Sequence, residues 1–217
     1  VWSNVDPIVA TVFDTGAEPL FQVQAYPGGV PSYKDDGGVP TTAEHWQAYA
    51  EFMRGVVKHY NVDQSLGAGR KIRFWEMWNE PEIEKDGKLS KEAYMAFFNT
   101  VGAAMKSVDP TIQLIGPTAH SYRFNYNWLP WARDNLKGLD ILAWHQYGLG
   151  KKDSDEARMA SNRVFYQDNV IFEKKKGLPV AITEYHVSTT GLSNHANFSN
   201  EYGAAFLGSA LVNAVRG

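Results

Sequence analysis

The sequence has 217 residues, a formal net charge of −3 and no cysteine. Hydrophobic residues make up 44% and charged residues 21%, a balance that supports a folded core. The missing cysteines exclude disulfides, zinc–thiolate sites and cysteine nucleophiles. The weak charge gives no reason to expect nucleic acid or an acidic membrane as a partner, and no apolar run is long enough to span a bilayer.

The cellular compartment is left open by the missing cysteines, because bacterial secreted proteins without disulfides are common. No signal peptide is visible, but Val1-Trp2-Ser3 does not resemble a native start, so a leader could have been removed. A secreted or periplasmic location is therefore favoured. The aromatic content is more informative: 7 Trp, 11 Tyr and 11 Phe exceed what a core of this size needs. Flat apolar rings suit stacking on sugars or bases.

Apolar runs alternate with amphipathic helical stretches along the whole chain. In chain order the pattern predicts a helix over Val5–Gly16, a strand over Leu20–Pro27, a helix over Thr41–Tyr60, a strand over Lys71–Trp78, a helix over Ser90–Val108, a strand over Thr111–Thr118, a short helix over Asn125–Leu136 broken by Pro130, a strand over Leu139–Tyr147, a helix over Asp155–Gly177, a strand over Leu178–His186 and a helix over Asn200–Val215. We expect residues 1–217 to form one domain.

A βα unit repeated five times, with spacings that suit crossover helices, predicts an α/β fold with a parallel sheet. That sheet is either doubly wound or closed into a barrel. No glycine-rich phosphate loop follows any strand, which weakens the nucleotide-binding version. A (β/α)8 TIM barrel needs eight strands and about 250 residues. On the barrel interpretation the chain is therefore an incomplete portion of about five βα units.

The carboxyl ends of the predicted strands carry carboxylates, amides, imidazoles and aromatic rings, and in parallel α/β folds these ends build the site. The residues there are Gln24, Tyr26, Trp78, Asn79, Glu80, Thr118, His120, His145, Gln146, Tyr147, Glu184, Tyr185 and His186. This composition suits a hydroxyl-rich ligand held by hydrogen bonds and stacked on ring faces. Trp78 and Trp144, near strand ends, are candidates for such stacking.

Two of these positions, Glu80 and Glu184, place carboxylates three strands apart, across the pocket of a barrel. A protonated carboxyl can donate to a departing glycosidic oxygen while a second carboxylate attacks the anomeric carbon. Glu76 shares strand parity with Glu80, and we expect it to be a buried structural carboxylate paired with an arginine or lysine. His145 and His186 could in principle bind a metal, but no second cluster completes a zinc set, so no catalytic metal is expected.

The motif Glu76-Met77-Trp78-Asn79-Glu80-Pro81, followed much later by Ile182-Thr183-Glu184-Tyr185, resembles the clan A glycoside hydrolases, which are (β/α)8 barrels. With His145-Gln146-Tyr147 between them, these motifs look most similar to glycoside hydrolase family 39. That family includes β-xylosidases, α-L-iduronidases and some bacterial enzymes that cut exopolysaccharides. The resemblance implies that the chain covers about strand three to helix seven and lacks strands one, two and eight.

The resemblance also implies roles for the matching residues. Glu80 resembles the general acid/base, with a pKa raised in the free enzyme, and Glu184 resembles the nucleophile of a retaining mechanism. Asn79 resembles the ligand of the sugar's 2-hydroxyl, and His145 and Tyr147 resemble a pair that lines the subsite and orients the carboxylates. The further candidates for substrate contact are Trp78, Trp144, His120, Tyr26 and Gln24. The implied substrate is an oligo- or polysaccharide, with no cofactor, and a partner chain or a missing segment would supply the remaining strands.

Two alternatives stay open at this point. The chain could bind carbohydrate without turning it over, and sugar binding without hydrolysis, with both glutamates intact, would support that function. It could also be another α/β enzyme, such as an esterase or a metal-dependent hydrolase. That alternative is disfavoured, because no G-x-S-x-G elbow and no adequate ligand set is present. The sequence does not indicate which sugar or anomer is cleaved, or whether cleavage is internal or terminal.

Overall fold

A computed structural model of the chain describes residues 2–24, 40–83, 89–122, 126–148, 154–187 and 200–217. One parallel sheet forms the centre of the fold, with its strands in the order β1-β2-β3-β4-β5. The strands are β1 (Leu20–Val23), β2 (Phe74–Met77), β3 (Gln113–Ala119), β4 (Leu139–Tyr147) and β5 (Val180–His186). Consecutive strands are neighbours, as expected for a (β/α)8 barrel and not for a doubly wound sheet.

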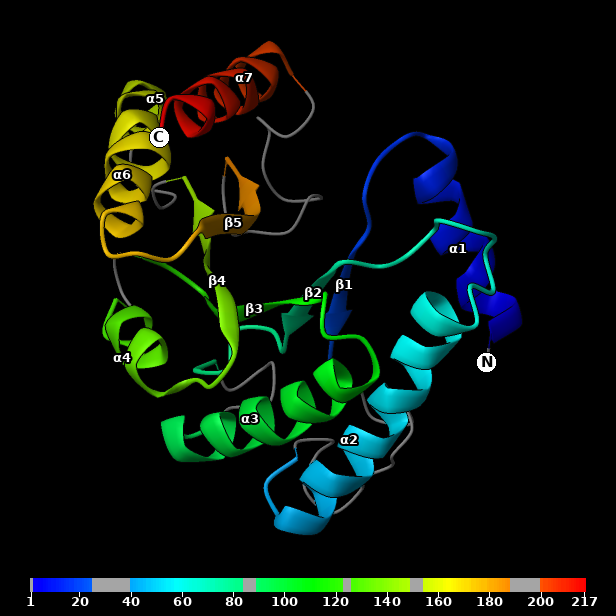
Figure 1. Ribbon diagram of the computed structural model, residues 1–217. Coiled ribbons are helices and arrows are strands. Elements are labelled where there is room, and N and C mark those ends of the chain that lie inside the picture. Colours follow the sequence, from blue (N-terminus) through cyan, green and yellow to red (C-terminus); the bar gives the residue numbers. More distant parts are fainter. Residues whose placement is uncertain (1, 25–39, 84–88, 123–125, 149–153, 188–199) are drawn as a thin grey trace.

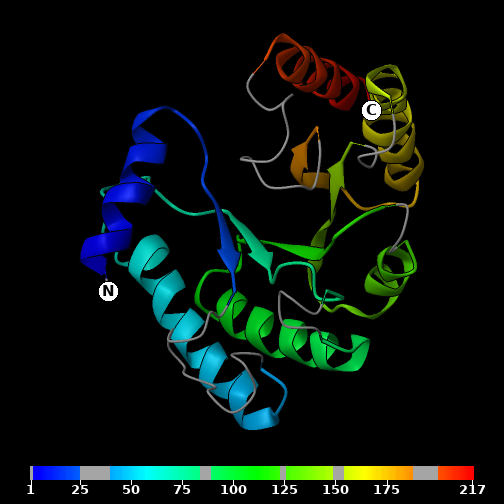
Figure 2. The ribbon, with the colours of Figure 1, turned by 180° about the vertical axis from the view of Figure 1, so that it is seen from behind.

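The helices run around the outside of the curved sheet, and both views show the same arc (Figures 1 and 2). They are α1 (Trp2–Asp14), α2 (Ala43–Val57), α3 (Lys91–Val108), α4 (Trp128–Asn135), α5 (Asp155–Arg163), α6 (Asn169–Lys174) and α7 (Glu201–Arg216). The predicted caps form: the Thr42 hydroxyl accepts from the His45 N–H, and Ser90 accepts from Ala93. Among the described residues, no helix combines the length and the apolar character needed to cross a membrane.

Two predicted helices differ from the observed ones in detail. Pro130 does not break its helix, because it lies in the first turn of α4, where its missing N–H would have no helical partner. The predicted helix over Asp155–Gly177 is instead α5, a π-helical turn at Val164–Asp168, and α6, which ends at Lys174. A π-helical turn at Lys58–Val62 likewise follows α2.

The strands alternate between two faces, and each face has its own core. Outward-facing residues such as Trp75, Leu114 and Leu142 pack with the helices in the main core. Inward-facing Ile115, Ile141 and Ala143 form a small separate cluster, with Phe74 and Ala181 packed against it. The next inward positions toward the carboxyl ends of β2, β4 and β5 are polar: Glu76, His145 and Thr183. The apolar inner cluster therefore supports a polar layer.

Candidate active site

The turn after β2 holds Glu80 in an unusual backbone conformation. Trp78 and Glu80 have positive φ angles of 77° and 40°, and Thr118 at the end of β3 has a φ of 56°. Such a residue costs about 1–3 kcal/mol and persists only where its surroundings fix it. Here the Trp78 N–H donates to Val23 O at 2.9 Å, and the Glu80 N–H donates to Thr118 O at 3.2 Å. The turn is thus bonded to the strands on both sides of β2.

Two imidazoles contact the same oxygen of Glu80. Its Oε1 lies 2.8 Å from Nδ1 of His145 on β4 and 2.6 Å from Nδ1 of His120, which follows β3. Burial acts to raise the pKa of Glu80, but the hydrogen bonds from His120 and His145 outweigh it and hold that pKa below its usual range. The expectation of a raised pKa is therefore wrong for the free protein. The sequence could not show that both rings face one carboxylate.

Glu184 lies beside this group on β5, where it pairs in register with His145. The Tyr147 hydroxyl donates to Glu184 Oε2, and His145 Nδ1 lies 3.5 Å from the same oxygen. Burial and the hydrogen bond to Glu184 raise the pKa of Tyr147, so the phenol remains a donor. The Glu184 side chain is 40% exposed, in contrast to the buried Glu80. One carboxylate is open to a ligand, and the other is capped by imidazoles.

The two carboxylates lie close to each other. One oxygen each of Glu80 and Glu184 and one ring nitrogen of His145 lie within 4.8 Å of one another. The carboxyl groups of retaining glycosidases are about 5–5.5 Å apart and those of inverting ones about 6.5–9.5 Å apart. The same atoms have the donor types of a cation site, but Glu80 is bonded to imidazole and Glu184 to Tyr147. That no metal acts here stays a prediction.

Behind the carboxylates, an amide network joins β1 to the turn after β2. Gln22 Nε2 donates to Glu76 Oε2 at 3.2 Å and to Asn79 Oδ1 at 3.1 Å. The prediction that Glu76 is buried is confirmed, but its expected arginine or lysine partner is wrong, since the partner is the Gln22 amide. The Asn79 oxygen is the acceptor in this bond, so the NH2 group is the donor that this side chain could offer to a ligand.

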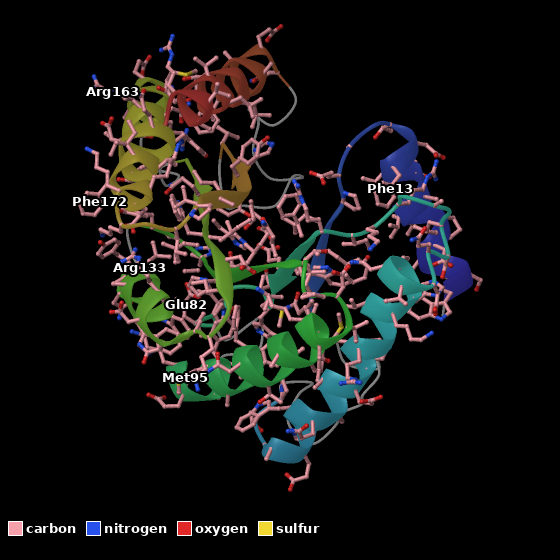
Figure 3. All side chains as sticks on the ribbon, in the orientation of Figure 1. Phe13, Glu82, Met95, Arg133, Arg163 and Phe172 are labelled. Carbon is pink, nitrogen blue, oxygen red and sulfur yellow. The ribbon has the colours of Figure 1, made fainter. Side chains whose placement is uncertain are left out.

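The loop after β3 carries His120 and is bonded on both sides. The His120 N–H donates to Glu82 Oε1 at 2.6 Å, and the Tyr122 hydroxyl donates to Glu173 Oε1 at 3.0 Å. Glu173 is buried on α6 and also bonds Arg133 of α4 at 2.5 Å. Figure 3 labels Glu82 and Arg133 among the side chains of this part of the molecule. These bonds hold the His120 ring in place against Glu80.

The sequence reasoning missed Gln22 and Glu82. Gln22 could have been found, because it shares strand parity with Gln24, which was on the list of candidates. Glu82 follows Pro81 in a turn closed by the Ile83 N–H and Glu80 O, and no pattern in the sequence marks it.

The structure does not bring all of the predicted contacts together. Trp78 and Trp144 are fully buried in the main core, where Trp78 packs edge-on against Phe97 of α3 and Trp144 packs against Tyr122. Their predicted stacking on substrate is therefore wrong in the described structure. Gln24 has a buried side-chain oxygen that lacks a hydrogen-bond partner within the described residues. Tyr26 lies outside the described residues.

Comparison with known protein families identifies the family of the chain. The model of Glycosyl hydrolases family 39 matches residues 1–215. The chain belongs to this family. The resemblance inferred from the two glutamate motifs is thus confirmed at the level of the family.

Individual relatives agree with the family. A curated β-xylosidase of Geobacillus stearothermophilus is 25% identical over 115 residues, which are 51% of this chain and 22% of that protein. A glucosidase structure from Croceicoccus marinus has a TM-score of 0.71 at 19% identity and covers 98% of this chain and 42% of its own. A monomeric β-xylosidase structure from Caulobacter crescentus CB15 has a TM-score of 0.65 at 18% identity, covering 96% and 46%.

These structures support the fold, and the sheet has the strand order of a (β/α)8 barrel. The family 39 chain is therefore an incomplete portion of that barrel, as predicted. It spans less than half the length of these relatives.

Proposed function

We propose that this family 39 chain carries the catalytic pair of a retaining glycoside hydrolase that cleaves O-glycosidic bonds of an oligo- or polysaccharide. The observation that carries the proposal is that one oxygen of Glu80, after β2, and one oxygen of Glu184, on β5, lie within 4.8 Å of each other. That spacing favours retention, because inversion requires room for a water molecule between the sugar and the base. The relatives named β-xylosidase and glucosidase support the glycoside class, and the individual sugar stays open.

In the first step, a carboxylate oxygen of Glu184 forms a bond to the anomeric carbon while the bond to the leaving oxygen breaks. Protonated Glu80 gives its proton to that oxygen, so that the leaving group departs as a neutral alcohol. Tyr147 donates to Oε2 of Glu184, which leaves lone pairs of the carboxylate for the attack. The hydrogen bond fixes the carboxyl group in one orientation, and fixed geometry is a large part of the rate gain of an enzyme.

In the second step, Glu80 acts as a base. It removes a proton from water, the hydroxyl attacks the anomeric carbon, and Glu184 leaves as a carboxylate. His145 and His120 favour the ionised form of Glu80 that this step requires. The Asn79 amide would donate to the 2-hydroxyl of the sugar. Gln24 would accept a hydrogen bond from another hydroxyl through its buried oxygen, which lacks a partner within the described residues.

The experiment compares wild-type protein with Glu184→Gln and Glu80→Gln. An activated 2-deoxy-2-fluoroglycoside should leave its glycosyl group on Glu184, seen as a mass increase on the peptide that contains this residue. Glu80→Gln should still be labelled by a substrate with a good leaving group, whereas Glu184→Gln should not be labelled. On ordinary glycosides, Glu80→Gln should lose about 10²–10⁴-fold in rate.

The same experiment tests the non-catalytic alternative. Binding of an oligosaccharide without label and without hydrolysis would support a carbohydrate-binding function and overturn the catalytic one. Inversion of the anomeric configuration in the product, seen by NMR, would remove Glu184 from the role of nucleophile. We further propose that strands from another segment or chain cover the open edges at β1 and β5 when the protein is active.

A further inference from the structure

Glu76 and His145 form a second, deeper contact behind the carboxylate pair. Glu76 Oε1 lies 4.0 Å from His145 Nε2, and both side chains are buried, with relative exposures of 3% and 0% for the residues. Neither atom has a hydrogen-bond partner within the part of the chain that the structure describes. The other ring nitrogen of His145 faces Glu80 and Glu184. His145 therefore lies between an inner carboxylate and the site.

A count of the protons in this contact indicates that one is shared between Glu76 and His145. An ionised carboxylate only accepts hydrogen bonds, so His145 Nδ1 must carry the proton that it shares with Glu80. If the ring is neutral, Nε2 is a bare acceptor that faces Glu76 Oε1. Two buried acceptors opposite each other are costly in a protein interior unless a donor reaches them. A proton held between Glu76 and His145 would satisfy both atoms.

The surroundings favour Glu76 as the holder of this proton. Burial is the largest influence and raises the pKa of Glu76, outweighing the hydroxyl of Thr183, the ring of His145 and the amide of Gln22. The nearby Glu184 acts in the same direction as burial. The polar groups around the Glu76–His145 pair come from five elements: they are Gln22 on β1, Glu80 after β2, Tyr94 on α3, and Thr183 and Glu184 on β5, with His145 itself on β4.

We propose that Glu76 stores the proton that His145 relays to Glu80 for the general-acid step, an inference that rests on the proposed glycosidase function. In the relay, the Glu76 carboxyl proton moves to Nε2 of His145 while the Nδ1 proton moves to Glu80 Oε1. The imidazole begins and ends neutral and changes only its tautomer. Glu76 becomes a carboxylate and Glu80 a carboxylic acid, so that charge and protons balance.

The relay answers a difficulty that the site itself raises. Glu80 must be protonated to act as an acid, yet its imidazole partners favour the ionised form. After the leaving group has taken the proton, the water of the second step returns one to Glu80, and the relay runs backward to Glu76. The 4.0 Å separation is about 1 Å longer than a direct hydrogen bond. A rotation of the Glu76 carboxyl or one bridging water closes that distance.

The first test needs no catalytic activity. Infrared spectra of the whole chain at neutral pH should contain the C=O stretch of a protonated carboxylic acid. Glu76→Gln should remove this band. The control is Asp140→Asn, which changes a carboxylate on β4 that is bonded to Lys106 of α3. This substitution should leave the band in place. Absence of the band from wild-type protein, or its survival in Glu76→Gln, would overturn the proposal.

A second measurement keeps the test independent of whether Glu76→Gln folds. The ¹⁵N shifts of His145 in wild-type protein should identify a neutral ring with its proton on Nδ1. A doubly protonated ring would place the proton on His145 and would overturn storage on Glu76. Neither readout depends on turnover, so failure of the glycosidase proposal is distinguishable from failure of the relay.

Where the chain does turn over, leaving groups separate a relay from a merely structural role. Glu76→Gln should lose up to about 100-fold in kcat on glycosides whose leaving group needs a proton. It should lose little on dinitrophenyl glycosides, whose leaving group departs without one. Glu76 contacts no substrate and acts through His145, so KM should change little. An equal loss on both substrates would indicate a structural role and contradict the relay.

Discussion

His120 is the partner of Glu80 that can be changed with the least disturbance of the core. Its side chain is 28% exposed, whereas His145 is completely buried. Both rings contact the same carboxylate oxygen, and a donor to the charged form of an acid lowers its pKa. Both histidines therefore lower the pKa of Glu80, and only His120 can be substituted without disturbing the core.

Removing the His120 ring should raise the pKa of Glu80. In His120→Ala the carboxylate loses one hydrogen bond and one nearby positive charge, while burial, which favours the neutral acid, remains. A ¹³C titration of the Glu80 carboxyl should show its midpoint at higher pH than in wild-type protein. In an active enzyme the alkaline limb of kcat/KM, where the general acid loses its proton, should move upward as well.

The control is the hydrogen bond from Tyr147 to Glu184, which does not involve His120 and should persist in His120→Ala. A Glu80 midpoint that is unchanged or lower in His120→Ala would mean that His145 alone sets the ionisation of Glu80.

Part of the site could be predicted from residue order alone. Glu80, His145, Tyr147 and Glu184 were expected at strand ends, and the structure places them within hydrogen-bonding reach of one another. Their catalytic roles stay predictions. Trp144 was a wrong expectation that parity could have prevented, since His145 faces inward and the preceding residue must then face the helices. Strand parity would point Trp78 inward, but its positive φ turns it toward the helices, and no pattern in the sequence predicts that turn.

Among the secondary-structure elements, the ends of β4 and β5 show the tightest approach next to the site. The Gly148 N–H donates to His186 O at 2.8 Å, and a Cβ at Gly148 would lie 2.3 Å from Val187 O. The nearest obstacle is backbone, which cannot move away as the end of a flexible side chain could. The glycine therefore permits the close approach of the two strands that carry Tyr147 and Glu184.

Gly148→Ala should push these strand ends apart. We expect a loss of about 1–3 kcal/mol in the free energy of unfolding, typical of overpacking. The hydrogen bond from Tyr147 to Glu184 should weaken, and labelling of Glu184 by the fluoroglycoside should slow. Chemical denaturation measures the first effect and mass spectrometry the second.

Gly55→Ala is the matched control, because Gly55 lies within α2 and its added Cβ would meet no atom within 4 Å. It should stabilise the chain by about 0.5–1 kcal/mol, since glycine is unfavourable inside a helix. Equal effects of the two substitutions would show that the close approach of Gly148 to Val187 does not determine the free energy of unfolding.

The order of elements was the most predictable property of the fold. Each predicted strand is present, and the alternation with helices follows from the periods of the apolar residues. The π-helical turns at Lys58–Val62 and Val164–Asp168 were not predicted, because their sequences keep an ordinary helical pattern. Apolar periodicity alone did not give the order of the strands in the sheet, since it describes each strand but not which strands pair.

At the scale of the whole molecule, the sheet has an open edge at each end. β1 and β5 each pair with one neighbour in the described structure. Beside β5, an apolar cavity of about 220 Å³ is lined by residues that include Tyr185, Ile182, Leu211 and Ala214. Apolar side chains next to an unpaired strand edge favour association with another chain. The chain alone should therefore associate as its concentration rises.

Leu211→Glu should reduce this association, because it places a charge at the rim of the apolar cavity without removing a fully buried side chain. Val62→Glu is the control: Leu211 is 50% exposed and Val62 is 52% exposed, but Val62 lies in the π-helical turn after α2, away from β5. Light scattering over a dilution series should show a lower mean mass for Leu211→Glu than for wild-type protein or Val62→Glu. A monomer at every concentration would mean that the edge of β5 is protected within the chain.

An equal decrease in both variants would assign the effect to net charge, because each substitution adds one negative charge to a chain whose formal net charge is already −3. Only a decrease specific to Leu211→Glu identifies the open side of the half-barrel as the surface that another set of strands would cover.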